Sequence, residues 1–150
     1  MEKINLQNKT EAKKGKVEVY WFENKNTGLQ KTLFHRINIP LDSFNSGLDY
    51  ESQPVDTEIV IEWMKLNLDE PTNLDGLRLT TTPEDETEAS IYVGSAHNPC
   101  DIKNMELKMI TDNIYEMKCE LFVEFEYEGV AENEEFEFVT QLELDPKIKE

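Results

Sequence analysis

The chain has 150 residues, of which 38% are hydrophobic and 31% charged, and its formal net charge is −17. This length suits one domain with a core of its own, and the concentration of apolar residues in alternating runs excludes wholesale disorder. The negative charge disfavours binding to nucleic-acid phosphates or to an anionic membrane surface, and favours a basic protein partner.

The charge is unevenly distributed along the chain. Residues 1–36 hold eight lysines and arginines against four acidic residues, whereas residues 112–145 hold twelve acidic residues and one lysine. The acidity therefore belongs mainly to the C-terminal part. It either serves a binding function there or only keeps the protein soluble.

The N-terminal residues are polar and rich in lysine. We expect a mobile basic arm at residues 1–15 and a single β-rich domain at residues 16–146. Residues 16–23 carry large apolar side chains on both faces, which predicts a central strand or a strand of a closed barrel. A second strand is expected at residues 33–39, and Pro40 ends it.

Residues 41–54 contain many turn-forming residues and predict a loop. Phe44, Leu48 and Tyr50 are expected to fold back onto the core. Loops of this length are often functional, but packing on the core is the more common outcome.

Residues 55–68 are rich in β-branched side chains and predict a long strand. The alternation breaks near Trp63 and Met64, which indicates a bulge. Shorter strands are expected at residues 76–82 and 89–93.

The clearest pattern covers residues 115–127, where apolar odd positions alternate with even positions that are charged, except Phe122. Together with its neighbours it predicts a three-strand meander over residues 104–145. If the apolar groups share one face, the first loop holds an odd number of residues, here residues 112–114. The expected partners are Met109 with Met117, Leu107 with Cys119, and Met105 with Leu121.

The second turn of the meander determines which glutamates face one another. The expected partners are Phe125 with Phe136, Val123 with Phe138, Glu124 with Glu137, Glu126 with Glu135, and Lys118 with Glu143. Like charges directly opposite destabilise a sheet by about 0.2–1 kcal/mol per pair. Phe122 and Val139, among these glutamates, indicate either an interaction surface or a region that another part of the chain covers.

The elements add up to about seven to eight strands with little helix. Their spacing predicts a mainly β fold: an antiparallel β-sandwich or a partly open β-barrel that ends in the three-strand meander.

His97 and Cys100 form the densest cluster of reactive side chains. They can supply two zinc ligands, or a thiol beside a base, but a structural zinc site needs four ligands and the chain offers no second close pair. We therefore expect a loop there and no metal. The chain contains no P-loop, no GxGxxG and no GxSxG motif, so we expect no cofactor and no enzymatic activity.

The leading hypothesis is an acidic protein-binding module, and the best interpretation is an immunity or inhibitor protein that neutralises a basic toxin or nuclease. The likeness to bacterial immunity proteins lies in size, charge and the lack of catalytic motifs only. The expected binding residues of the C-terminal sheet are Glu116, Glu120, Phe122, Glu124, Glu126, Glu135, Glu137 and Val139.

Three alternatives stay open at this point. The first is a barrel or sandwich that holds a small apolar ligand between aromatic residues 20–22 and the methionines Met105, Met109 and Met117. The others are a mimic of nucleic-acid phosphates and a structural subunit whose edges pair between copies. Two cysteines without a disulfide framework, and no signal peptide or membrane-length apolar run, predict a cytoplasmic protein.

Overall fold

The computed structural model describes residues 1–82 and 84–150 and is mainly β, as expected. The strands, in chain order, are β1 (Gly15–Asn24), β2 (Leu29–Pro40), β3 (Glu58–Met64), β4 (Arg78–Thr81), β5 (Glu88–Val93), β6 (Ala96–Thr111), β7 (Ile114–Val123) and β8 (Glu134–Leu144). The helical segments are α1 (Leu6–Lys9) and the 3-10 turn η1 (Lys25–Thr27). No helix of the described residues is long and apolar enough to cross a membrane.

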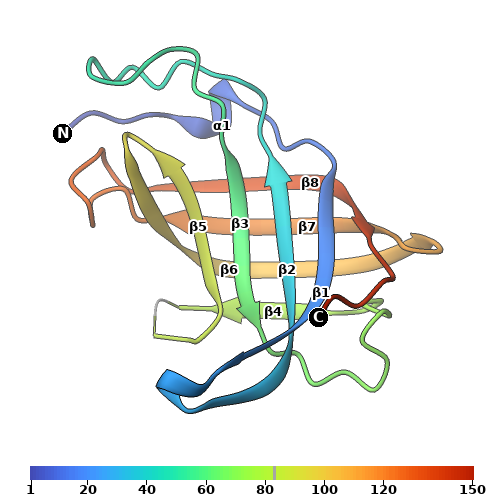
Figure 1. Ribbon diagram of the computed structural model, residues 1–150. Helices are drawn as coiled ribbons and strands as arrows, with labels where there is room; N and C mark the ends of the chain where they lie inside the picture. The colour runs from blue at the N-terminus through green and yellow to red at the C-terminus, as the bar shows by residue number, and fades with distance from the viewer. Residues whose placement is uncertain (83) are drawn as a thin grey trace.

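Seven of the strands close into a barrel in the order β6-β5-β3-β2-β1-β8-β7, because β7 also pairs with β6. Figure 1 shows β5, β3, β2 and β1 crossing in front of β6, β7 and β8. The strand β4 pairs with β6 beyond the end of β5, outside this closed ladder. Of the two predicted architectures, the barrel is the one that forms.

The barrel closes at a parallel seam between β1 and β8, whereas the other strand pairs are antiparallel. Gly15 pairs with Leu142 at this seam. A Cβ atom on Gly15 would lie 2.6 Å from the main-chain oxygen of Asn38 and 2.7 Å from Cδ2 of Leu142. Glycine is thus the residue that lets the first and last strands approach one another.

The strands β6, β7 and β8 form the predicted three-strand meander, but the predicted register between β6 and β7 was wrong by two residues. Met105 pairs with Cys119, and Leu107 pairs with Met117. The reason lies in the turn: the loop holds only Asp112 and Asn113, and the ladder shifts by one residue between Met109 and Thr111. A two-residue loop plus a one-residue bulge keeps the apolar groups on one face as well as a three-residue loop does.

The second connection is longer than predicted, because β7 ends at Val123 and β8 begins at Glu134. Leu121, not Phe125, therefore pairs with Phe136. Phe125 is fully buried although it has left the ladder. The chain after β7 thus folds back to pack on the core instead of extending the strand.

The barrel interior is packed with side chains that alternate inward along each strand. Fully buried members of this core include Val19, Ile37, Ile61, Met105, Tyr115, Met117 and Leu142. On the outer side, Phe22 and Phe34 pack against Trp63, with ring centroids 5.2 and 5.4 Å apart. This explains why β1 is apolar on both faces. The bulge predicted near Trp63 is confirmed by a shift in the β2–β3 ladder and by a φ of 59° at Trp63.

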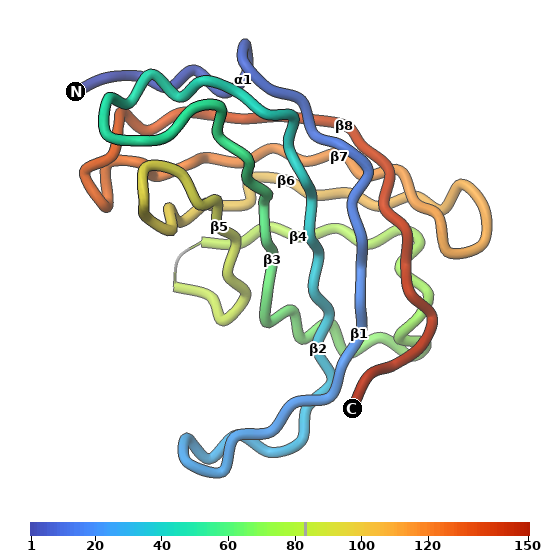
Figure 2. The backbone as a smooth tube through the Cα atoms, turned by 45° about the horizontal axis from the view of Figure 1, so that its top comes forward, coloured from blue at the N-terminus to red at the C-terminus, as the bar shows by residue number. Residues whose placement is uncertain are grey.

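The loop that joins β2 to β3 folds onto the core as predicted for Phe44 and Leu48, which are both buried. The prediction was wrong for Tyr50, which is 64% exposed. The N-terminal segment, expected as a mobile arm, lies along the same end of the barrel (Figures 1 and 2). Ile4 and Leu6 of this segment are fully buried.

Glu134 holds the N-terminal segment in place. This carboxylate is only 5% exposed, and it accepts hydrogen bonds from the main-chain N–H groups of Asn5, at 2.9 Å, and Leu6, at 2.5 Å. A buried carboxylate is tolerated because these two donors satisfy it.

Replacing Glu134 tests this role. Glu134→Ala leaves two main-chain donors without an acceptor, so we expect the free energy of unfolding to fall by about 2–3 kcal/mol in urea denaturation. Glu135→Ala is the matched control, because Glu135 is the exposed neighbour on the outer face and its loss should cost less than about 0.5 kcal/mol. Equal losses in the two variants would contradict the role given to Glu134.

Candidate functional site

The outer surface of β7 and β8 carries six of the eight residues predicted for binding, and five of these gather toward the Val123 end of β7. We call this part of the surface the acidic face, and its residues are Glu120, Phe122, Glu135, Glu137 and Val139. Glu120 lies directly opposite Glu137, and Phe122 lies opposite Glu135. Val139 is 60% exposed. The inward side of the same strands is apolar, so period-2 alternation leaves the carboxylates outside.

The other end of the outer surface is less acidic than predicted. Glu116 lies opposite Lys108 on β6, and Lys118 lies between Glu106 and Val139. The expected pair of Lys118 with Glu143 does not form, since Glu143 lies opposite Ile114 and makes an ion pair with Lys14 at 3.0 Å. Excess negative charge is therefore concentrated toward the Val123 end of β7.

Glu124 and Glu126 do not join the acidic face, because both follow the end of β7. The predicted pairs of Glu124 with Glu137 and of Glu126 with Glu135 were therefore wrong. Glu126 instead bonds to the main-chain N–H of Asn133 at 3.0 Å within the loop.

Glu124 lies beside a second carboxylate, Asp101 of β6. Burial and, next, the negative charge of Asp101 raise the pKa of Glu124, and the positive charge of Lys103 opposes this rise without cancelling it. The two carboxylates repel each other when both are ionised.

Phe122 lies at the edge of a small depression in the acidic face. This depression, of about 340 Å³, is lined by Phe122 and Glu135 together with Lys3, Gln7 and Asn133. The ammonium group of Lys103 lies 5.6 Å from the centroid of the Phe122 ring, a cation–π distance. Phe122 is thus half-buried at the rim of a concave site.

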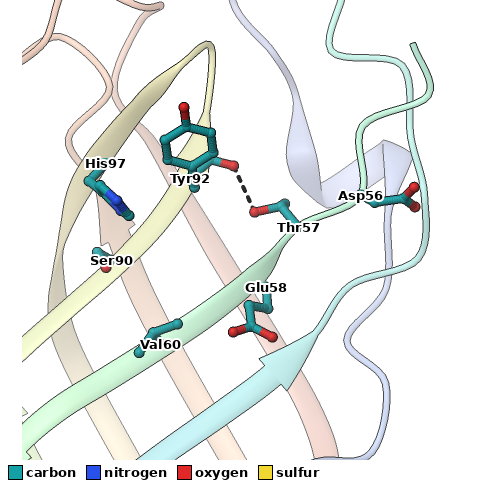
Figure 3. A pocket seen from close by; sticks show the side chains of 7 residues that line it. All are labelled: Asp56, Thr57, Glu58, Val60, Ser90, Tyr92 and His97. Atoms are coloured by element: carbon teal, nitrogen blue, oxygen red, sulfur yellow. Dashed lines mark hydrogen bonds between the residues drawn. The ribbon is translucent and has the colours of Figure 1, made fainter. Parts of the chain in front are cut away.

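A larger concave region, which the sequence did not reveal, crosses the outer surface of β3, β5 and β6. One depression of about 450 Å³ adjoins another of about 700 Å³, and both are lined by Val60, Ser90 and His97. We call the combined region the trough. Figure 3 shows its first part, where His97 and Tyr92 lie on one side and Glu58 and Val60 on the other.

The lining of the trough is strongly acidic and partly aromatic. Among the residues that the structure describes, no lysine or arginine lines it, and its carboxylates are Asp56, Glu58, Glu62, Glu88 and Glu124. Tyr92 is 48% and Tyr127 is 76% exposed. The rings of Tyr92 and His97 meet edge to face, with centroids 4.9 Å apart. The trough therefore offers negative charge and aromatic surface together.

His97 and Cys100 are not brought together. Both residues lie in the strand β6, so the prediction of a loop there was wrong. The His97 side chain is exposed, whereas Cys100 is buried. Residues three apart on a strand point to opposite faces. The described residues, 1–82 and 84–150, contain no group of three or more histidine, cysteine or acidic side chains that could hold a metal ion.

Both thiols are free and buried. Burial, with a further contribution from nearby negative charges, raises the pKa of Cys100, and it raises the pKa of Cys119 to about 12. The reactive thiolate is then scarce at neutral pH.

We expect neither thiol of the folded protein to react with Ellman's reagent at pH 7 while both react in guanidinium chloride. The measurement is the absorbance released per chain. Rapid reaction of one thiol in the folded protein would instead indicate an accessible, activated cysteine.

The residues considered for an apolar ligand lie apart from one another. Met105 and Met117 are fully buried in the core, and Met109 packs at its edge. Tyr20 lies on the outer surface, where it packs against Phe34, with ring centroids 6.0 Å apart. Core and surface packing account for these side chains without a ligand.

Comparisons with models of protein families, with curated proteins and with solved structures found no match for this chain.

The carboxylate pair gives a prediction about pH. The raised folded-state pKa of Glu124 means that its contribution to stability is favourable in acid and is lost as the pH rises through that pKa. At pH 7 we therefore expect Glu124→Gln to raise the free energy of unfolding by about 0.5 kcal/mol, since the pair is partly exposed and screened. The gain should vanish below about pH 4.

Urea denaturation across this pH range provides the measurement, and Glu128→Gln in the same loop, where the side chain is exposed, is the matched control. A gain that is the same at pH 7 and pH 4, or that Glu128→Gln reproduces, would argue against repulsion between Asp101 and Glu124.

Proposed function

We propose that this protein is a non-enzymatic binding module for a basic protein, and that the acidic face is its binding surface. The best interpretation is an immunity or inhibitor protein that blocks a cationic effector such as a toxin or a nuclease. The proposed compartment is the cytoplasm, in keeping with the two free thiols, Cys100 and Cys119.

The observation that carries this proposal is the placement of Glu120 directly opposite Glu137 on an exposed surface. A cross-strand pair of like charges costs about 0.2–1 kcal/mol in the free protein. Among the described residues, neither carboxylate lies within ion-pair distance of a lysine or arginine. A cationic side chain from a partner would relieve this repulsion, so the same feature that weakens the sheet favours association.

Apolar anchors support a specific interface and not only a diffuse attraction. Phe122 and Val139 lie among the carboxylates, and Phe122 borders a depression. Interfaces gain most of their affinity from a few such apolar or aromatic anchors, whereas the surrounding charges steer the encounter. Opposite charge speeds association, and burial of Phe122 slows dissociation.

The proposal is tested by capture on the immobilised protein from an extract of its own cells at low salt. We expect a captured protein with a basic surface, and we expect Phe122→Ala, which leaves the charge unchanged, to reduce its affinity at least about tenfold. The double variant Glu120→Gln/Glu137→Gln should weaken binding at least about threefold.

The matched control is Glu84→Gln/Glu86→Gln, which removes the same charge from an exposed loop between β4 and β5. If this control weakens binding as much as Glu120→Gln/Glu137→Gln does, or if Phe122→Ala has no effect, the interaction depends on net charge alone and the acidic face is not a specific site.

A further inference from the structure

We propose that the trough is a second binding surface, separate from the acidic face, which takes an extended polypeptide segment carrying arginine side chains. This inference concerns a different set of residues from the proposed function, and either can fail while the other holds.

The trough is suited to an extended chain because of its shape. Its two depressions share Val60, Ser90 and His97, so it runs continuously from Asp56, before β3, to Tyr127, after β7. Their volumes, about 450 and 700 Å³, are those of pockets that each hold a drug-sized molecule. A single cationic side chain would fill only part of this space, whereas a segment of several residues can occupy both depressions.

The charge of the trough identifies the chemistry of its occupant. Among the described residues, no lysine or arginine lies within ion-pair distance of Asp56, Glu58 or Glu88. Glu62 differs, because Arg36 reaches it at 2.9 Å. Glu124, at the far end, is already repelled by Asp101. The trough therefore holds several carboxylates that the chain itself leaves without a cationic partner.

The aromatic rings favour arginine over lysine. A guanidinium group stacks on aromatic rings and bonds to a carboxylate through two parallel N–H groups, whereas an ammonium group is a compact and strongly hydrated charge. Tyr92 is exposed beside His97, with Glu58 across the trough (Figure 3), and Tyr127 is exposed at the other end near Glu124. Each end thus pairs an aromatic ring with a carboxylate.

The position of Tyr92 is fixed by the main chain around it. The Thr57 hydroxyl donates a hydrogen bond to the main-chain oxygen of Tyr92 at 2.7 Å, which ties the end of β5 to the segment before β3. The two walls of the first depression are therefore joined before any ligand binds, which lowers the entropy lost on binding.

The test uses nitrogen-15-labelled protein titrated with a synthetic peptide of alternating glycine and arginine. We expect the main-chain NMR signals of Val60, Ser90, Tyr92 and His97 to move, and we expect the same signals to move to the same extent in Glu120→Gln/Glu137→Gln, which weakens the acidic face but leaves the trough intact. Tyr92→Ala should weaken peptide binding about threefold or more, as the loss of a partly exposed cation–π contact predicts.

Charge is tested with a matched pair of double variants. Glu58→Gln/Glu88→Gln should weaken the peptide at least about threefold, whereas Glu11→Gln/Glu23→Gln, which removes two exposed carboxylates outside the trough, should leave it unchanged. Equal weakening by both would overturn the proposal, as would signals of Val60, Ser90, Tyr92 and His97 that stay in place at saturating peptide.

Two further ligands, a lysine peptide and spermine, decide the chemistry of the occupant. A lysine peptide of the same length should bind more weakly than the arginine peptide, and equal affinity would overturn the preference for guanidinium. Spermine serves as a small polycation without a peptide backbone, and binding at the trough as tight as that of the arginine peptide would overturn the requirement for an extended polypeptide.

Discussion

The closed ladder of hydrogen bonds around the barrel determines where the charged side chains of this protein can lie. Closure leaves an interior filled by residues such as Tyr115 and Met117, in which an unpaired carboxylate would be very costly. Because side chains alternate, the strand that places Leu121 inside must place Glu120 and Phe122 outside. The alternation that fills the core with apolar side chains thus also places the carboxylates on the surface.

Alternation made the faces of the strands predictable, although it did not make their partners predictable. The register differed by two residues between β6 and β7 and by four between β7 and β8, both even numbers, so each side chain stayed on its expected face. Phe122 and Val139 were therefore correctly placed on the outer surface, while the identity of the opposing glutamates was wrong. Ile110 occupies the bulge, and nothing in its local sequence distinguishes it from a regular strand residue.

The features that the sequence did not reveal are those made by segments far apart in the chain. The trough joins residues from β3, β5, β6 and the segment after β7, each of which belongs to the ordinary polar face of its own strand. In the sequence, nothing distinguishes Glu134 from the surface glutamates around it. Its hydrogen bond from the main-chain N–H of Leu6 joins residues 128 positions apart. Ile4 and Leu6 were too few in a polar segment to predict burial. Tertiary packing decides such cases, and period-2 patterns carry no information about it.

The seam between β1 and β8 also has a consequence for how the protein folds. These strands stand near opposite ends of the chain, so the barrel has no complete ring of strands until β8 has been synthesised. Before that, β1 and β7 each present an unpaired edge, and such edges recruit strands from other molecules. Contacts of this sequence separation form slowly. A nascent chain of this protein is therefore vulnerable to strand exchange until β8 pairs with β1 at Gly15 and closes both edges.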